Sequence, residues 1–281
     1  MAFRNYEIRS SENKPISIDI HIPQKSAQKV PFIIFSHGFK GFKDWGTFNM
    51  IADWFAEKGF GFVKFNFSHN GVTSQSPLEF TDLDAFGNNT FSKEMDDLGS
   101  VIDFVLTEPF LTENKLNSEK MYLVGHSRGG SISVLKTAED KRVKKLVTWG
   151  AVNDLGKSWT PDFVKKWKKE GQIVVLNSRT GQQMPVNYSL YEDYQRHLDR
   201  LYVQAAVIKM NIPFLIIHGR NDETVGVSEA YEINDWNKEC TEIYIVEDAN
   251  HVFGAKHPWE TGTLPNQTKE VLHKTLNFLL N

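Results

Sequence analysis

Three residues of this chain have the types and positions that nucleophilic catalysis requires: Ser127, Asp222 and His251. A serine hydroxyl is a weak nucleophile near neutral pH, so it needs a histidine to take its proton and an acid to orient that histidine. Each of the three follows an apolar run that predicts a β-strand. The chemistry that such a set performs is acyl transfer through a covalent serine intermediate.

The motif around Ser127 is Gly125-His126-Ser127-Arg128-Gly129, which fits the pattern G-x-S-x-G. Glycines two residues before and after the serine leave room for a sharp strand-to-helix turn that exposes the hydroxyl. The apolar run MYLV precedes the motif, and SISVL follows it as the expected start of a buried helix. A serine in this position is also typical of a helix N-cap, and the motif alone leaves that alternative open.

The acid and the base are expected in two later loops. Asp222 lies three residues after Gly219, beyond the apolar run 212–217. Glu223 is the alternative acid in this loop, and Asp222 could also be an ordinary turn residue. His251 lies four residues after Glu247, where the next strand is expected to end. Two further histidines are poorer candidates for the base, one before a proline and one in the C-terminal helix: His257 and His273.

The elements that position these loops follow from the hydrophobic pattern. Segments 49–59 and 91–106 have apolar residues at helical spacing. Apolar or alternating runs predict strands at 16–22, 31–38, 59–68, 120–127, 143–151, 212–219 and 241–248. Strands separated by helices indicate an α/β fold, a three-layer sandwich around a mainly parallel sheet with an antiparallel N-terminal edge. Ligands of such sheets bind beyond the carboxyl ends of the strands.

Residues 152–209 are too many for one crossover between two strands. The segment contains a short amphipathic helix at 161–171, two extended runs within 172–188 around the turn Arg179-Thr180-Gly181, and a longer helix at 190–208. We expect this insertion to form a lid over a core made of residues 1–151 and 210–281. The lysines of KKWKK (165–169) indicate a solvated helix face rather than a binding patch.

The order Ser127, Asp222, His251 along the chain resembles the α/β-hydrolase superfamily, and the resemblance extends from the early strands to the C-terminal helix. It implies a serine hydrolase that cleaves an ester, thioester or amide. Ser36-His37-Gly38-Phe39 matches the superfamily's oxyanion loop, which implies that the backbone N–H groups of Phe39 and Arg128 bind the oxyanion. His37 itself is expected to be structural.

The hairpin in the insertion and the sequence HGF in the oxyanion loop are similar to the cinnamoyl and feruloyl esterase branch and to dienelactone-hydrolase-like proteins. The segment NFSHNGVTSQS matches the turn often found there only in part. The resemblance implies an ester with a small or aromatic acyl group as substrate. A thioesterase, an acyltransferase, or a hydrolase-like ligand-binding protein with slow turnover would use the same residues.

Aromatic side chains are frequent in the insertion and near the strand ends. The candidates for a substrate pocket are Phe39, Trp149, Tyr188 and Tyr191, although the aromatic residues of the insertion could equally form its own small core. Arg128 could bind an anionic substrate or pair with a carboxylate, and the sequence leaves both possibilities open.

Composition narrows the remaining classes of function. With 40% hydrophobic residues and a net charge of -3, the chain has no basic field for nucleic acid. No run is apolar enough to cross a membrane, no secretory signal is evident, and the single Cys240 excludes an internal disulfide. We therefore expect a cytoplasmic protein that acts on a small-molecule ester without a cofactor or metal. The sequence does not indicate the oligomeric state.

Overall fold

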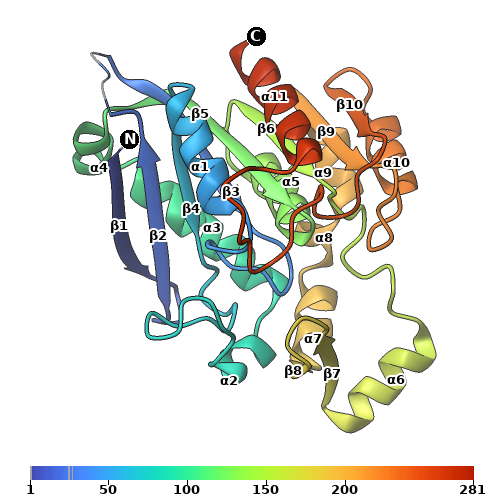
Figure 1. The fold of residues 1–281 in the computed structure, drawn as a ribbon. Helices are drawn as coiled ribbons and strands as arrows, with labels where there is room; N and C mark the ends of the chain where they lie inside the picture. Colours follow the sequence, from blue (N-terminus) through green and yellow to red (C-terminus); the bar gives the residue numbers. More distant parts are fainter. Residues whose placement is uncertain (1, 25, 27) are drawn as a thin grey trace.

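The structure is a computed structural model that describes residues 2–24, 26 and 28–281. Its centre is an eight-stranded sheet in the order β1-β2-β4-β3-β5-β6-β9-β10 (Figure 1). From β4 to β10 neighbouring strands run parallel, whereas β1 and β2 form the antiparallel edge that the sequence predicts. The strands of the sheet are β1 (Ala2–Arg9), β2 (Pro15–Ile22), β3 (Val30–Ser36), β4 (Gly61–Phe65), β5 (Leu116–His126), β6 (Lys145–Trp149), β9 (Phe214–Gly219) and β10 (Thr241–Val246).

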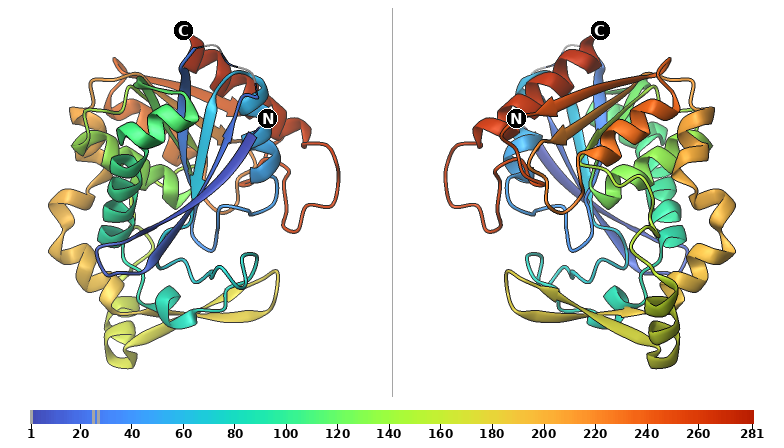
Figure 2. Two further views of the ribbon diagram at one scale, coloured as in Figure 1. Left: turned by 90° about the vertical axis from the view of Figure 1, so that its left-hand side faces the viewer. Right: turned by 90° about the vertical axis from the view of Figure 1, so that its right-hand side faces the viewer.

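Helices cover both faces of this sheet, which confirms the three-layer sandwich (Figure 2). Helices α1 and α11 pack on one face, and α3, α5, α9 and α10 pack on the other. The helices are α1 (Phe48–Glu57), α2 (Leu83–Gly87), α3 (Phe91–Val105), α4 (Glu108–Asn114), α5 (Arg128–Glu139), α6 (Pro161–Glu170), α7 (Ser189–Arg196), α8 (Leu198–Leu201), α9 (Val203–Lys209), α10 (Ser228–Trp236) and α11 (Asn266–Leu280). None of the helices in these described ranges is both long and apolar enough to cross a bilayer.

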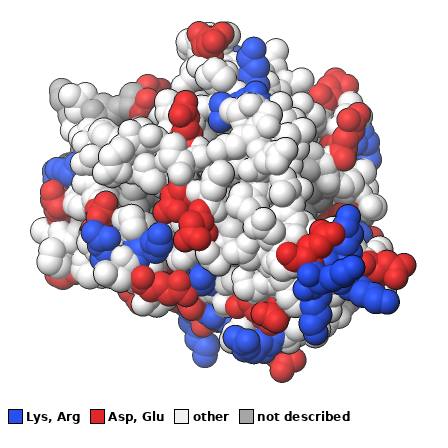
Figure 3. Space-filling view, turned by 90° about the horizontal axis from the view of Figure 1, so that it is seen from below, with Lys and Arg blue, Asp and Glu red and all other residues white. Residues whose placement is uncertain are grey.

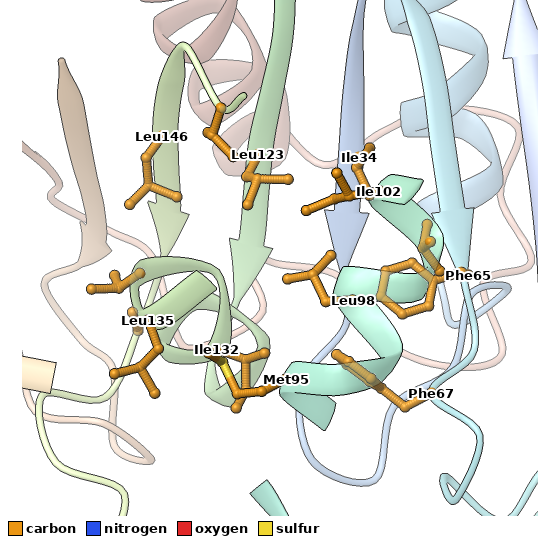
Figure 4. Close-up of a cluster of buried hydrophobic side chains, with 14 of the residues drawn as sticks. Ile34, Phe65, Phe67, Met95, Leu98, Ile102, Leu123, Ile132, Leu135 and Leu146 are labelled. Atoms are coloured by element: carbon orange, nitrogen blue, oxygen red, sulfur yellow. The ribbon is translucent and has the colours of Figure 1, made fainter. Parts of the chain in front are cut away.

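The apolar stripe expected over residues 91–106 lies on α3 and faces the sheet. Met95, Leu98 and Ile102 are fully buried against side chains of β3, β4 and β5, and α5 continues the same layer (Figure 4). Burial of each such side chain contributes about 2 kcal/mol to the stability of the fold. This packing holds the start of α5, and therefore Ser127, at the carboxyl end of the central strand β5.

The insertion lies beyond the carboxyl ends of the strands (Figure 1). Strands β7 (Gln172–Asn177) and β8 (Gln182–Asn187) form an antiparallel hairpin around the turn at 178–181, as the sequence predicts. The hairpin is attached to the segment before α3, because Gln182 Nε2 donates to the carbonyl oxygen of Phe80 at 2.8 Å and Asn187 Nδ2 donates to Asn88 Oδ1 at 2.9 Å.

The prediction of a single helix at 190–208 is wrong. The chain instead forms α7, α8 and α9, with breaks at His197 and Tyr202. The two ends of this segment pack in different places, because Tyr194 of α7 packs against aromatic residues of the insertion while Val207 of α9 is buried against the core. A straight helix could not make both contacts. Helix α9 is also tied to the core by Asn237, whose Nδ2 donates to the carbonyl oxygen of Val207 at 2.8 Å.

Candidate active site

Ser127 lies on a strained turn between β5 and α5. Its φ of 54° and ψ of -127° are backbone angles that a residue with a side chain seldom adopts. The flanking glycines are required here, since a Cβ on Gly125 would lie 2.6 Å from Cα of Gly130, and one on Gly129 would lie 2.7 Å from the carbonyl carbon of Ser36. Both distances are closer than real Cβ contacts. The turn therefore explains the spacing G-x-S-x-G, and Ser127 does not cap α5 through its side chain.

His251 and Asp222 are joined by a hydrogen bond of 2.7 Å between Nδ1 and Oδ2. A carboxylate only accepts, so Nδ1 carries the proton and Nε2 of His251 is left with a lone pair. The other oxygen of Asp222 accepts from the backbone N–H groups of Thr224 at 2.9 Å and Val225 at 2.8 Å. Burial alone would raise the pKa of Asp222, but the hydrogen bonds from His218 and His251 outweigh it and hold this pKa well below its usual value.

Two further histidines, neither of which was predicted from the sequence, support this pair. His218, the fully buried residue before Gly219, lies with Nε2 2.8 Å from the carbonyl oxygen of Val225 and 3.3 Å from Asp222 Oδ2. His126 Nε2 donates to the carbonyl oxygen of His251 at 2.9 Å. Burial lowers the pKa of His126 to about 3, so it is neutral. The sequence signal for both was their position directly beside a strand-end glycine or serine.

The backbone N–H groups of Phe39 and Arg128 are both free of hydrogen bonds within the described part of the chain. Arg128 is the first residue of α5, where an N–H has no acceptor in its own helix. Gly38 brings the loop of Phe39 against the serine, because a Cβ on Gly38 would lie 2.8 Å from Cβ of Ser127. The two donors are therefore available beside Ser127.

The side chain of Arg128 pairs with a buried carboxylate, one of the two possibilities that the sequence left open. Its Nη1 lies 3.5 Å from Oε1 of Glu94, which also accepts from Asn89 at 2.6 Å. The guanidinium group is stacked between two rings, with Cζ 4.0 Å from the centroid of Phe39 and 5.1 Å from that of Phe91. The side chain of Arg128 is therefore held by contacts within the protein.

A cavity of about 950 Å³ lies between the strand ends and the hairpin, and both Ser127 and His251 line it. The hairpin contributes Val175 and the segment 177–179 to its wall. One part of the lining is aromatic and consists of Phe39, Phe42, Trp45, Phe48 and Phe80. A largely apolar cavity of this size with a few polar groups is typical of a small-molecule site.

Three of the four predicted pocket residues lie elsewhere, and only Phe39 lines this cavity. Trp149 follows the alternation of β6 into the core under α1 and α11, where its Nε1 donates to Oγ1 of Thr275 at 3.1 Å. Tyr188 and Tyr191 stack on each other with 5.5 Å between ring centroids. They belong to the aromatic core of the insertion, together with Trp159, Phe163, Trp167 and Tyr194.

The rival residues of the sequence analysis have other positions. Glu223 is exposed, and His273 packs on Trp54 at the outer surface of α11. His257 lines the cavity, but its Nδ1 accepts from the N–H of Gly46 at 2.8 Å. His37 is buried and bonds to the carbonyl oxygen of Gly38 at 2.9 Å through Nδ1, and burial lowers its pKa to about 4. Among residues 2–24, 26 and 28–281, no group of three or more acidic, histidine or cysteine side chains could hold a metal ion.

Comparisons with known proteins identify the family of this chain. The family model BD-FAE matches residues 18–236. A Mycoplasma genitalium protein provisionally named esterase/lipase 2 is 25% identical over 222 residues, covering 70% of this chain and 74% of that protein.

Two solved structures share the fold. Est1E from Butyrivibrio proteoclasticus with ferulic acid bound superposes with a TM-score of 0.72 at 17% identity over 98% of both chains. A Klebsiella pneumoniae protein provisionally named a dienelactone hydrolase superposes with a TM-score of 0.61 at 13% identity over 100% of both chains. The resemblance to the α/β-hydrolase superfamily and this branch of it is confirmed. The chain is therefore an α/β-hydrolase that belongs to the BD-FAE family.

Proposed function

We propose that this protein is a serine hydrolase that cleaves a carboxylic ester of a small or aromatic acyl group through an acyl-enzyme intermediate. The observation that carries the proposal is the 2.7 Å hydrogen bond between His251 and Asp222 at the cavity that Ser127 also lines. The aromatic part of the lining supports an aromatic acyl group, as does the similarity to a protein that binds ferulic acid.

In the proposed reaction, Oγ of Ser127 attacks the ester carbonyl while Nε2 of His251 takes the hydroxyl proton. Asp222 holds the imidazole in the required tautomer and stabilises its positive charge. The carbonyl oxygen, which gains negative charge, accepts hydrogen bonds from the N–H groups of Phe39 and Arg128. His251 then gives its proton to the departing alcohol, and water, deprotonated by the same histidine, releases the acid.

A nucleophile test comes first. Ser127→Ala should lower kcat on a simple aryl ester by several orders of magnitude, and it should abolish labelling by a fluorophosphonate probe. Ser100→Ala is the matched control, because Ser100 lies on α3 and its Oγ donates to the carbonyl oxygen of Asp96 in the same helix. More than about a hundredth of the parent activity in Ser127→Ala would contradict the proposal.

A panel of aryl esters, acyl thioesters and hydroxycinnamate esters then tests the substrate class. We expect the highest kcat/KM with esters of aromatic or short acyl groups. A preference for thioesters, or transfer to an alcohol in place of water, would assign the same residues to a thioesterase or an acyltransferase.

A further inference from the structure

The cavity beside Ser127 has a charge opposite to that of the chain. The protein carries a net charge of -3, yet the cavity lining contains the basic residues Lys40, Arg128, Lys157, Arg179 and Lys256, against the acidic residues Asp154 and Glu229. The lower face of the molecule as a whole carries both signs in neighbouring groups (Figure 3). The positive excess is therefore a property of the cavity lining.

Two of these basic residues are neutralised by the protein. Arg128 pairs with Glu94 behind the cavity, and Nζ of Lys157 lies 3.4 Å from Oε1 of Glu229. The remaining acid, Asp154, accepts hydrogen bonds from Tyr194 at 3.0 Å and from the N–H of Gly156 at 2.8 Å. Both acids thus lie with Lys157 on one wall of the cavity.

The other three basic residues, which we call the cationic rim, are Lys40, Arg179 and Lys256. Within the described residues, none of them has a carboxylate within 4.0 Å. They come from three separate segments: the loop after Phe39, the turn of the hairpin, and the loop after His251. Their convergence on one cavity depends on the fold.

A hydrogen bond of Lys40 and an electrostatic effect of Arg179 relate the rim to neighbouring segments of the cavity lining. Lys40 Nζ donates to the carbonyl oxygen of Leu176 at 3.1 Å, which holds this lysine against the hairpin. The positive charge of Arg179 adds to burial in lowering the pKa of His257, the neighbour of Lys256 in the chain. A partly enclosed space that several unpaired cations line favours the binding of a negatively charged ligand.

We propose that the substrate carries an anionic group, such as a carboxylate, on a part of the molecule away from the reacting ester, and that the cationic rim binds it. An apolar body would then lie against the aromatic lining and the charged group at Lys40, Arg179 and Lys256. This inference rests on the proposed esterase function and specifies its substrate class.

The test compares esters that differ only in charge. Methyl esters of cinnamic acids with a para carboxylate, methyl or trimethylammonium group place the charge on the acyl half, and benzoate esters of correspondingly substituted phenols place it on the alcohol half. In at least one series we expect kcat/KM to rank the anionic ester first and the cationic ester last. The ratio of anionic to neutral kcat/KM should fall with added salt, because screening weakens exposed charges.

Variants assign the preference to the rim. Arg179→Gln and Lys256→Gln should each lower the anionic-to-neutral ratio by about threefold, and the double variant by about tenfold. Lys168→Gln removes an exposed charge from α6 outside the cavity lining, and it should leave the ratio unchanged. Equal rates for the three charge types in both series, or a ratio unaffected by the double variant, would overturn the proposal.

Binding separates this inference from the esterase function. Calorimetry with the amides of the same acids and the Ser127→Ala protein measures binding to the rim without turnover. Tighter binding of the anionic amide than of the neutral one, lost in the double variant, would support the anion site even if no ester were cleaved; the esterase function would then be contradicted. Cleavage of esters without a charge preference in rate or binding would contradict the anion site and leave the esterase function supported.

Discussion

The guanidinium group of Arg128 stacks on the ring of Phe39, with 4.0 Å between Cζ and the ring centroid. These are the two residues whose backbone N–H groups we propose as the oxyanion donors. Each belongs to a different element, the loop after β3 and the start of α5, and the stack links the two. Glu94 holds the guanidinium group from behind. We therefore expect the side chains to set the spacing of the two N–H groups.

Arg128→Met should lower kcat by about tenfold, because a small displacement of one donor weakens binding of the transition state. It should also lower the free energy of unfolding by about 3 kcal/mol, since it leaves Glu94 buried without a charged partner. Steady-state kinetics and urea unfolding measure the two effects. The double variant Glu94→Gln, Arg128→Met should regain most of the stability but not kcat. Recovery of kcat in the double variant would show that the arginine acts only on stability.

His218→Leu should lower kcat/KM by about threefold, because Asp222 loses a hydrogen-bond donor that helps to hold it against His251. The carbonyl oxygen of Val225 can only accept, so His218 Nε2 carries a proton that also faces Asp222. His218→Gln keeps an N–H donor and should keep kcat/KM near its parent value. Steady-state kinetics on an aryl ester measure the effect. A kcat/KM in His218→Leu equal to that of the parent would mean that His218 only fills space.

Lys64→Met should lower the free energy of unfolding by about 3 kcal/mol. Lys64 and Lys43 form a closed ring of ion pairs with Asp19 and Asp44, with four N···O distances between 2.5 and 2.7 Å. Lys64 is fully buried, so its loss leaves two acids facing one lysine. The exposed pair of Lys238 and Asp235 is the matched control, and Lys238→Met should change stability by less than about 0.5 kcal/mol. A loss in Lys64→Met no larger than that of the control would contradict this view of the ring.

Stability should depend on His126 between about pH 6 and pH 4.5. Burial lowers the pKa of His126 to about 3. In this window the unfolded chain therefore protonates the histidine and the folded protein does not, so stability falls as the pH falls. Each such histidine contributes a slope of about 1.4 kcal/mol per pH unit.

Asp97 has the opposite sign in the same window, because burial raises its pKa to about 7 and the folded form binds the additional proton. The comparison of His126→Gln with the parent cancels this contribution. Urea unfolding at several pH values should show a slope smaller by about one proton in the variant. Equal slopes in the two proteins would mean that His126 is protonated in the folded state.

Local pattern was sufficient to predict much of this protein. Strands with apolar runs, the helix at 91–106 and the hairpin around Arg179 depend on side-chain periodicity and turn residues within one segment. The prediction of one helix at 190–208 was wrong because the ends of this segment pack against different parts of the molecule, and no local pattern shows that. The prediction of Trp149 as a pocket residue was wrong for a similar reason, since its position at a strand end does not show on which face of the sheet its side chain lies.

By itself, the sequence determined the chain order of Ser127, Asp222 and His251, the glycines that permit the turn at Ser127, and the alternation of strands and helices behind them. These features are local, because backbone sterics and hydrophobic period act over a few residues. Only the tertiary structure decided that His218 and His126 support the acid and the base, that Arg128 stacks on Phe39 with Glu94 behind it, and that Lys40, Arg179 and Lys256 face one cavity. Contacts between residues far apart in the chain arise only when the sheet and its two helical layers bring separate loops together.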